Sequence, residues 1–312
     1  MAKEKQTGGK KRITGARIAK EIRQYKKDVF LSPMYTTFCV ILEILIPYLT
    51  ASIIDKGIAV GDMGHVARIG ALMAVMAVLA MFCGMRAGIH SARASTGLAS
   101  NLRESMFARI QDYSFSNIDK FSTAGLVTRL TTDVTNIQNA FQMLLMICTR
   151  APVTLIVALF MAFSISARLS LIFLAAMAFL AVMLVIFIPK AMGYFKQMFK
   201  KYDKVNGVVK ENVGAIRVVK AFVREDYEDQ KFSDAAGELF QNSISAERII
   251  SFNMPIMQLT VYSCILLISW FGAKMIVNQT GLTTGELTSL LSYVMNILMS
   301  LMMLSMVLVM VT

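Results

Sequence analysis

The chain has 312 residues, of which 56% are hydrophobic and 17% charged, and its formal net charge is +12. A soluble domain is ordinarily about half apolar and about a quarter charged, so this composition excludes an ordinary soluble domain and predicts an all-α membrane protein. The positive charge does not require a nucleic-acid partner, because basic segments beside a membrane face anionic lipid headgroups.

The N-terminal segment, residues 1–28, is basic and is expected to lie in the cytoplasm. Ile18, Ile22, Tyr25 and Val29 recur on one helical face, and Lys and Arg occupy much of the remainder. This pattern is typical of an amphipathic helix that lies in the membrane interface. The short apolar core and cleavage site of a secretory signal are missing, so we expect no cleaved leader.

Residues 29–312 are predicted to form a six-helix transmembrane domain. Each apolar run matches the roughly 20 residues that a helix needs to cross the hydrocarbon core. The expected spans cover residues 29–54, 66–85, 140–163, 169–189, 252–277 and 287–311. Thr283 and Glu286 form a capping-box pair that is typical of a helix start. The two long connections, about 86–139 and 190–251, keep helical periodicity and predict two polar helical hairpins.

The distribution of Lys and Arg predicts the orientation of the chain. Residues 1–28 hold 10 of them, residues 86–129 hold 6 and residues 190–248 hold 11, whereas the connections on the other side of the membrane hold 4. Because loops rich in Lys and Arg stay in the cytoplasm, we expect a multi-pass protein of the cell (plasma) membrane. Both termini and both hairpins would then be cytoplasmic.

Three segments carry a resemblance to a known family. They read SNIDKFSTAGLVTRLTTDVTNI at 116–137, ENVGAIRVVKAFVREDYEDQKF at 211–232 and GLTTGELTSLLSYV at 281–294. In this order among six spans, they resemble the transmembrane half of an ATP-binding-cassette (ABC) exporter of the multidrug or lipid type. The residues that match the family pattern are Asp119, Thr123, Leu126, Arg129 and Asp133 in the first segment, and Glu211, Asn212, Gly214, Val219, Lys220, Ala221, Phe222 and Glu225 in the second.

The resemblance implies a half-transporter that moves hydrophobic or amphipathic cargo (drug, lipid or peptide-like) out of the cytoplasm or inner leaflet by alternating access. ATP and Mg would be used by ATPase domains, and a second half-transporter would complete the cavity. Ala124 and Gly125 replace the family's usual glycine and acid, a departure that resembles the heterodimeric branch and favours a non-identical partner.

The complete transporter would be an ATP-hydrolysing translocase, but the sequence contains no GxxxxGK[ST] phosphate loop. The apolar run also ends at Thr312 without a polar tail, so we expect the chain to be part of a longer protein. The alternative is a membrane module without an ATPase, acting as a channel, receptor or scaffold.

The resemblance also implies that each hairpin ends in a short helix that docks onto an ATPase domain, near residues 116–121 and 214–222. The spacing of Ile216, Val219 and Phe222 predicts one apolar edge on the second docking helix. The expected coupling residues are Asn117, Asp119, Phe121, Gly214, Ile216, Arg217, Val219, Lys220 and Phe222.

Two charges and a methionine series fall inside expected spans. Glu43 and Arg150 are costly in hydrocarbon, so they are expected either to line a substrate path or to form a structural ion pair. Methionines in the sixth span fall on one helical face, and their flexible thioethers suit varied ligands, although ordinary helix packing would also explain them. The members named for a substrate path are Met295, Met299, Met302 and Met306. No catalytic, cofactor-binding or metal-binding constellation is predicted.

Overall fold

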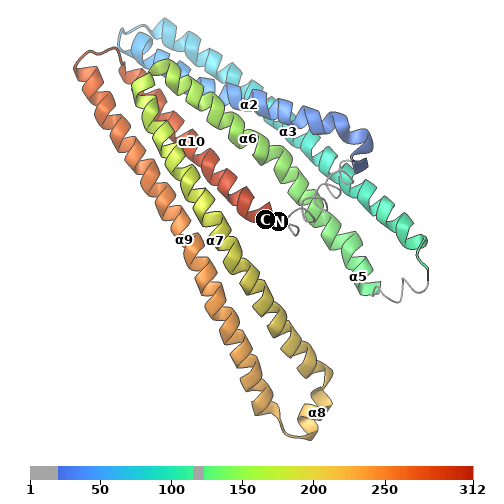
Figure 1. Cartoon of the computed structure of the whole chain (residues 1–312). Coiled ribbons are helices and arrows are strands. Elements are labelled where there is room, and N and C mark those ends of the chain that lie inside the picture. Colours follow the sequence, from blue (N-terminus) through green and yellow to red (C-terminus); the bar gives the residue numbers. More distant parts are fainter. Residues whose placement is uncertain (1–19, 115–122, 312) are drawn as a thin grey trace, which may run out of the picture. The chain divides into compact units, whose positions relative to one another are not determined.

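A computed structural model describes residues 20–114 and 123–311. In this part of the chain the principal elements are α2 (Lys26–Ser52), α3 (Met63–Gln111), α5 (Thr123–Thr128), α6 (Val134–Ile165), α7 (Ala167–Gly214), α8 (Ile216–Ala221), α9 (Glu225–Val277) and α10 (Thr284–Val311) (Figure 1). A 3-10 turn, η1 (Arg23–Tyr25), precedes α2, and π-helical turns, η2 (Ile53–Ile58) and η3 (Arg129–Asp133), follow α2 and α5. Within these described ranges, six helices are long and apolar enough to cross a membrane, which confirms the predicted fold class.

Three of the helices are far longer than a membrane is thick. The helices α3, α7 and α9 have 49, 48 and 53 residues, and at about 1.5 Å per residue each is roughly 70–80 Å long. The hydrocarbon core is only about 30 Å thick. The polar residues that follow the second and fourth apolar runs therefore belong to the same continuous helices as those runs.

The chain divides into two compact units, one made mainly of residues 1–167 and 271–307 and the other mainly of residues 168–270. In the first unit α2 packs against both α3 and α6. Small buried residues of α3, Ala80 and Ala87, allow α2 to approach closely, and their carbonyl oxygens accept from Cys39 and Ser32 of α2. The helix α10 joins the same unit through the buried Tyr293, whose hydroxyl donates to the carbonyl oxygen of Ile44 at 3.1 Å.

The start of α10 is fixed by the predicted capping box and by a residue of η2. The backbone N–H of Thr283 donates to Glu286 Oε2 at 3.0 Å, and the backbone N–H of Glu286 donates to Thr283 Oγ1 at 3.2 Å. Asp55 accepts from Thr283 Oγ1 at 2.6 Å and from the Gly285 N–H at 2.9 Å. Asp55, which follows the first span, thus provides a second cap for α10, the sixth span.

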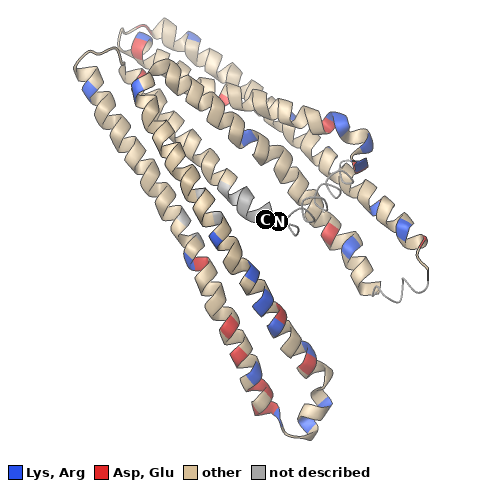
Figure 2. Cartoon of the chain, in the orientation of Figure 1, with Lys and Arg blue, Asp and Glu red and all other residues tan. Residues whose placement is uncertain are grey.

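In the second unit α7 and α9 run antiparallel and side by side, with α8 at the tip of the hairpin (Figure 1). Charged residues gather in the half of the hairpin next to α8 (Figure 2). Lys201 and Lys204 of α7 both donate to Glu238 of α9, at 2.7 Å and 3.0 Å, and Lys231 of α9 donates to Glu211 of α7 at 2.9 Å. These ion pairs join the two polar arms.

Candidate functional site

The tip of the second hairpin is a short helix set between two chain reversals. The helix α7 ends at Gly214, and Ala215 leaves helical geometry with φ −108° and ψ 18°. After α8 the chain turns again at Val223, which has φ 51°, and α9 begins at Glu225. Residues 216–221 therefore form a separate helix at the position where the family resemblance implies the second docking helix.

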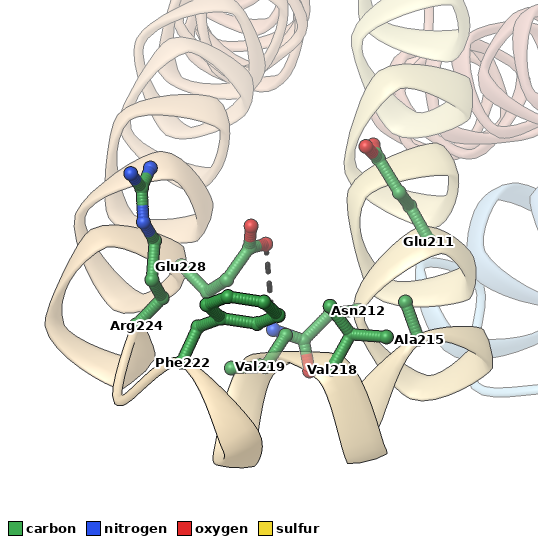
Figure 3. A pocket seen from close by; sticks show the side chains of 8 residues that line it. All are labelled: Glu211, Asn212, Ala215, Val218, Val219, Phe222, Arg224 and Glu228. Atoms are coloured by element: carbon green, nitrogen blue, oxygen red, sulfur yellow. Dashed lines mark hydrogen bonds between the residues drawn. The ribbon is translucent and has the colours of Figure 1, made fainter.

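A cavity of about 340 Å³ is enclosed by the end of α7, the short helix α8 and the start of α9 (Figure 3). Asn212 Nδ2 donates to Glu228 Oε2 across it at 3.4 Å. The side chains that line the cavity are those of Glu211, Asn212, Ala215, Val218, Val219, Phe222, Arg224 and Glu228. The lining combines an apolar floor from α8 with carboxylates from both arms.

The predicted apolar edge of α8 is wrong in one respect. Val219 is only 9% exposed, whereas Ile216 is 43% and Phe222 74% exposed. Val219 and Phe222 both line the cavity, but Val219 is buried, so the three residues do not form one evenly exposed edge. The exposed apolar surface of the tip also includes Val218 and Val223, which are 57% and 83% exposed.

Charged groups surround this apolar surface. Arg217 is exposed, and Lys220 Nζ donates to Glu225 Oε1 at 3.0 Å. That hydrogen bond lowers the pKa of the Glu225 carboxyl below its ordinary value. The guanidinium of Arg224 lies over the ring of Tyr227 at 5.6 Å. The tip thus carries basic and apolar groups side by side, as an interface for another protein requires.

The corresponding residues of the first hairpin, Asn117, Asp119 and Phe121, lie outside the described residues. Beyond them α5 begins at Thr123, which belongs to the segment that carries the family resemblance.

The two charges inside the spans meet. Arg150 Nη2 of α6 donates to Glu43 Oε2 of α2 at 2.6 Å, and the side chains are 44% and 40% exposed in the chain. The Cys39 thiol donates to Glu43 Oε1 at 3.4 Å. The sequence placed these charges in two spans, and the packing of α2 against α6 brings them together.

The methionines of α10 divide between exposed and packed positions. Met295 is 47% and Met299 57% exposed, and Met302 is partly buried. The side chain of Met306 lies outside what the structure describes. The opposite side of α10 is buried through Leu290, Tyr293, Val294, Ile297, Leu298 and Leu301. Met295 and Met299 therefore face away from the core of their own unit.

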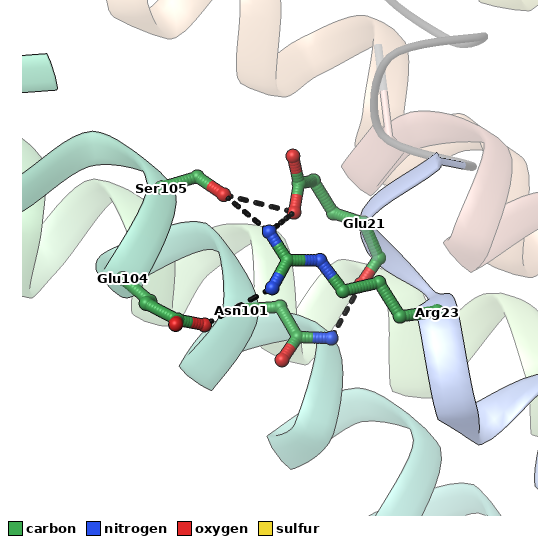
Figure 4. Close-up of polar contacts among 5 residues, drawn as sticks. All are labelled: Glu21, Arg23, Asn101, Glu104 and Ser105. Atoms are coloured by element: carbon green, nitrogen blue, oxygen red, sulfur yellow. Dashed lines mark hydrogen bonds and ion pairs between the residues drawn. The ribbon is translucent and has the colours of Figure 1, made fainter. Parts of the chain in front are cut away.

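The entry into α2 is a feature that the sequence pattern did not predict. Arg23 has φ 42° and donates to Glu104 Oε2 at 3.1 Å and to Ser105 Oγ at 3.0 Å (Figure 4). Asn101 Nδ2 donates to the Glu21 carbonyl oxygen at 2.7 Å. The basic N-terminal pattern therefore does not continue as one regular helix through residue 25. Its described part is fastened to α3, and its interfacial placement stays a prediction.

A second unpredicted residue is Asp55, which caps α10 from η2. Its position near the end of an apolar run gave no sign of a partner more than two hundred residues away. Among the described residues, no group of three or more His, Cys, Asp or Glu side chains is arranged to hold a metal ion.

Comparison with known proteins assigns the chain to a family. Residues 29–302 match the family described as the ABC transporter transmembrane region. The chain is 32% identical over 237 residues to an uncharacterized ABC transporter ATP-binding protein, YfiB, of Bacillus subtilis, covering 76% of this chain and 41% of that protein. It is 30% identical over 261 residues to another such protein, Rv1273c, of Mycobacterium tuberculosis, covering 84% of this chain and 45% of that protein.

A more distant relative is named an ATP-dependent lipid A-core flippase, from Albidiferax ferrireducens; it is 24% identical over 279 residues, which cover 88% of this chain and 47% of that protein. The chain thus spans less than half the length of these curated relatives. The family match covers all but the ends of the chain and agrees with the six apolar helices. The protein therefore belongs to the ABC transporter transmembrane region family.

Proposed function

We propose that this chain is the membrane part of an ATP-driven exporter and that α8 transmits force from an ATPase domain. The observation that carries the proposal is the tip of the α7–α9 hairpin, where an exposed apolar surface is flanked by Arg217, Lys220 and Arg224. A rigid helical arm with such a tip serves a protein driven from one side of the membrane. A plain channel has no comparable need for it.

The relatives support an ATPase partner, because two of them are named ATP-binding proteins and the chain spans 41% and 45% of their lengths. ATP and Mg would be bound by ATPase domains outside residues 1–312, since this sequence has no phosphate loop. We infer that the cytoplasmic side holds both termini and both hairpins, in agreement with the Lys and Arg distribution. The cell membrane is the proposed location.

A second half-transporter would complete the cavity, and the Ala124–Gly125 pair favours a non-identical one. The proposed cargo is hydrophobic or amphipathic. The flippase relative is named for lipid A-core, and the exposed thioethers of Met295 and Met299 provide a surface that adapts to varied apolar shapes. In the proposed cycle, ATP-driven closure of the ATPase domains changes which side of the membrane the cargo site faces.

Charge reversal at the tip tests the proposal in the complete transporter. We expect R217E to lower the amount of cargo moved per ATP hydrolysed by about tenfold, because a reversed charge at a complementary interface both repels and desolvates its partner. K196E, which reverses an exposed charge on α7 far from the tip, is the matched control. Transport and ATPase rates are measured together in proteoliposomes.

Equal coupling in R217E and K196E would contradict the docking role of α8. Cargo movement that does not depend on ATP in the unaltered complete protein would contradict the exporter itself and favour the alternative of an ATPase-free membrane module. The pair K220E and K220E/E225K adds a check on the tip, since the double variant restores the ion pair that Lys220 makes with Glu225.

A further inference from the structure

A stripe of α3 changes from apolar to basic along a single exposed face. Phe82, Arg86, Ile89 and Arg93 follow one another at steps of four, three and four residues, so they lie on one side of the helix. All four are exposed. The same face continues toward the start of α3 through Leu72, Val75, Val78 and Leu79, which are between 45% and 60% exposed.

This change marks the edge of the hydrocarbon. The span of residues 66–85 has a single Lys or Arg, Arg68, near its start, and Arg86 is the first basic residue after it. The Arg86 guanidinium lies over the Phe82 ring at 5.1 Å, so the side chain reaches back toward the apolar part of the stripe. An arginine whose aliphatic stem lies along apolar surface and whose guanidinium lies over an aromatic ring is suited to the boundary between acyl chains and headgroups.

The charges of the stripe are not neutralised within the described chain. Between residues 20 and 114 and between 123 and 311, no carboxylate lies within 4.0 Å of the basic nitrogens of Arg86 or Arg93. The carboxylate that α2 brings to this level, Asp28, is already engaged with His90, whose Nδ1 lies 2.6 Å from Asp28 Oδ1. The ring of Tyr35 stacks on the His90 ring, with ring centroids 5.6 Å apart.

A third cation lies at the same level on the neighbouring helix, because the Asp28–His90 contact brings this part of α2 to residue 90 of α3. Lys27 of α2 directly precedes Asp28 and is exposed. Since Asp28 is held in the contact with His90, it does not neutralise Lys27 by an ion pair. The α2–α3 pair therefore presents three exposed cations at this level, two on the stripe of α3 and one on α2.

We propose that Arg86, Arg93 and Lys27 bind the phosphate of an anionic phospholipid in the cytoplasmic leaflet, with an acyl chain along the exposed stripe of α3. The guanidinium fork matches phosphate oxygens, and the two arginines are about 10 Å apart along the helix, within reach of one headgroup region. A lipid held there contacts both α2 and α3 and stabilises their packing. The site uses other residues than the hairpin tip and the methionines of α10 that we propose for cargo.

The test uses the complete transporter in nanodiscs of phosphatidylcholine with increasing phosphatidylglycerol. Thermal unfolding is followed, and the phosphatidylglycerol fraction that gives the half-maximal rise in Tm is compared between variants. We expect R86Q and R93Q each to require about fivefold more phosphatidylglycerol, as a basic residue near an anionic surface contributes about that factor. R86K/R93K, which retains the charge and removes the planar fork, should fall between the unaltered protein and R86Q/R93Q.

The matched control is K196Q/K200Q, which removes two exposed cations from α7 on the same side of the membrane. Unchanged phosphatidylglycerol dependence in R86Q/R93Q would overturn the proposal. The proposal would also be overturned if K196Q/K200Q raised the required phosphatidylglycerol fraction as much as R86Q/R93Q does. A general attraction of basic helices to anionic lipid would then explain the dependence of Tm on phosphatidylglycerol. Soluble glycerol phosphate added to phosphatidylcholine nanodiscs should leave Tm unchanged, and an equal rise with it would show an anion site in place of a lipid site. These outcomes do not depend on cargo transport.

Discussion

At the scale of single residues, Gly285 is required by how closely α10 approaches α2. A Cβ at this position would lie 2.5 Å from the carbonyl oxygen of Ala51 and 2.6 Å from Asp55 Oδ2. We expect G285A to lower the free energy of unfolding by about 1–3 kcal/mol, because the two helices must separate to admit the methyl group. Thermal or denaturant unfolding of the purified protein measures this.

The control for that change is G70A. Gly70 lies inside α3, and a Cβ there would meet nothing within 4 Å. Alanine is favoured over glycine in a helix by about 0.5–1 kcal/mol, so G70A should be neutral or stabilising. A similar loss of stability in both variants would contradict the role given to the α2–α10 contact.

The Glu43–Arg150 ion pair gives a second prediction at this scale. E43Q and R150Q each leave one charge without its partner in a span, and we expect each to lower stability by about 1–3 kcal/mol. The exchanged pair E43R/R150E should recover much of that loss, since the two side chains already meet at 2.6 Å. A double-mutant cycle measures their interaction energy.

The exchanged pair also distinguishes the two roles left open by the sequence. A structural ion pair predicts that E43R/R150E recovers both stability and cargo profile. A position on the cargo path predicts recovered stability with an altered cargo profile. Additive effects of E43Q and R150Q would show that the contact contributes nothing measurable.

At the scale of elements, the α7–α9 hairpin is held by ion pairs in the part that extends beyond the expected spans. Hydrogen bonds from Lys201 and then Lys204 lower the pKa of Glu238. A carboxyl whose pKa is lower in the folded state contributes stability above its ordinary pKa of about 4.3 and loses it as the pH falls through the lowered value. The polar half of the hairpin should therefore loosen on acidification below that ordinary pKa.

Hydrogen exchange of residues 196–208, corrected for intrinsic rates, checks this expectation. E238Q should lower the protection of these amides at neutral pH and remove the loss of protection on acidification. High salt should also lower their protection at neutral pH, because the paired charges are exposed and therefore screened. E247Q is the matched control, since Glu247 is exposed on the same helix and the structure gives it no ion pair in the described part of the chain. The same acid step in E238Q and in the unaltered protein would contradict the prediction.

At the scale of the whole molecule, the exposed thioethers of α10 are the surface that we propose for cargo. M295A/M299A, which removes the two exposed thioethers, should change the affinity or range of transported compounds. We expect a change of roughly fourfold in affinity for each methylene equivalent of lost apolar contact. The control M81A removes a thioether that is 67% exposed on α3, away from α10. Competition between labelled cargo compounds in proteoliposomes provides the measurement. Equal cargo profiles in the two variants would contradict a cargo role and leave ordinary helix packing as the explanation of the methionine series.

The short helix at the second hairpin tip was implied by the family resemblance. The sequence by itself determined the helical class, the six apolar runs and the capping box of α10. Each depends on local information: the length of a run against the thickness of the membrane, or the spacing of a few neighbouring residues. Helical periodicity also showed which residues share a face, as for the methionines of α10. Periodicity does not show which neighbour that face meets.

Only the tertiary structure decided those contacts. It paired Glu43 with Arg150, placed Asp55 at the start of α10, fastened Arg23 to α3 and turned Val219 toward its own hairpin. The first three join residues 107, 230 and 81 positions apart in the chain. Such partners are set by the packing of whole helices, in which burial of many apolar side chains outweighs the preference of any single charge, so no local pattern in the sequence contains them.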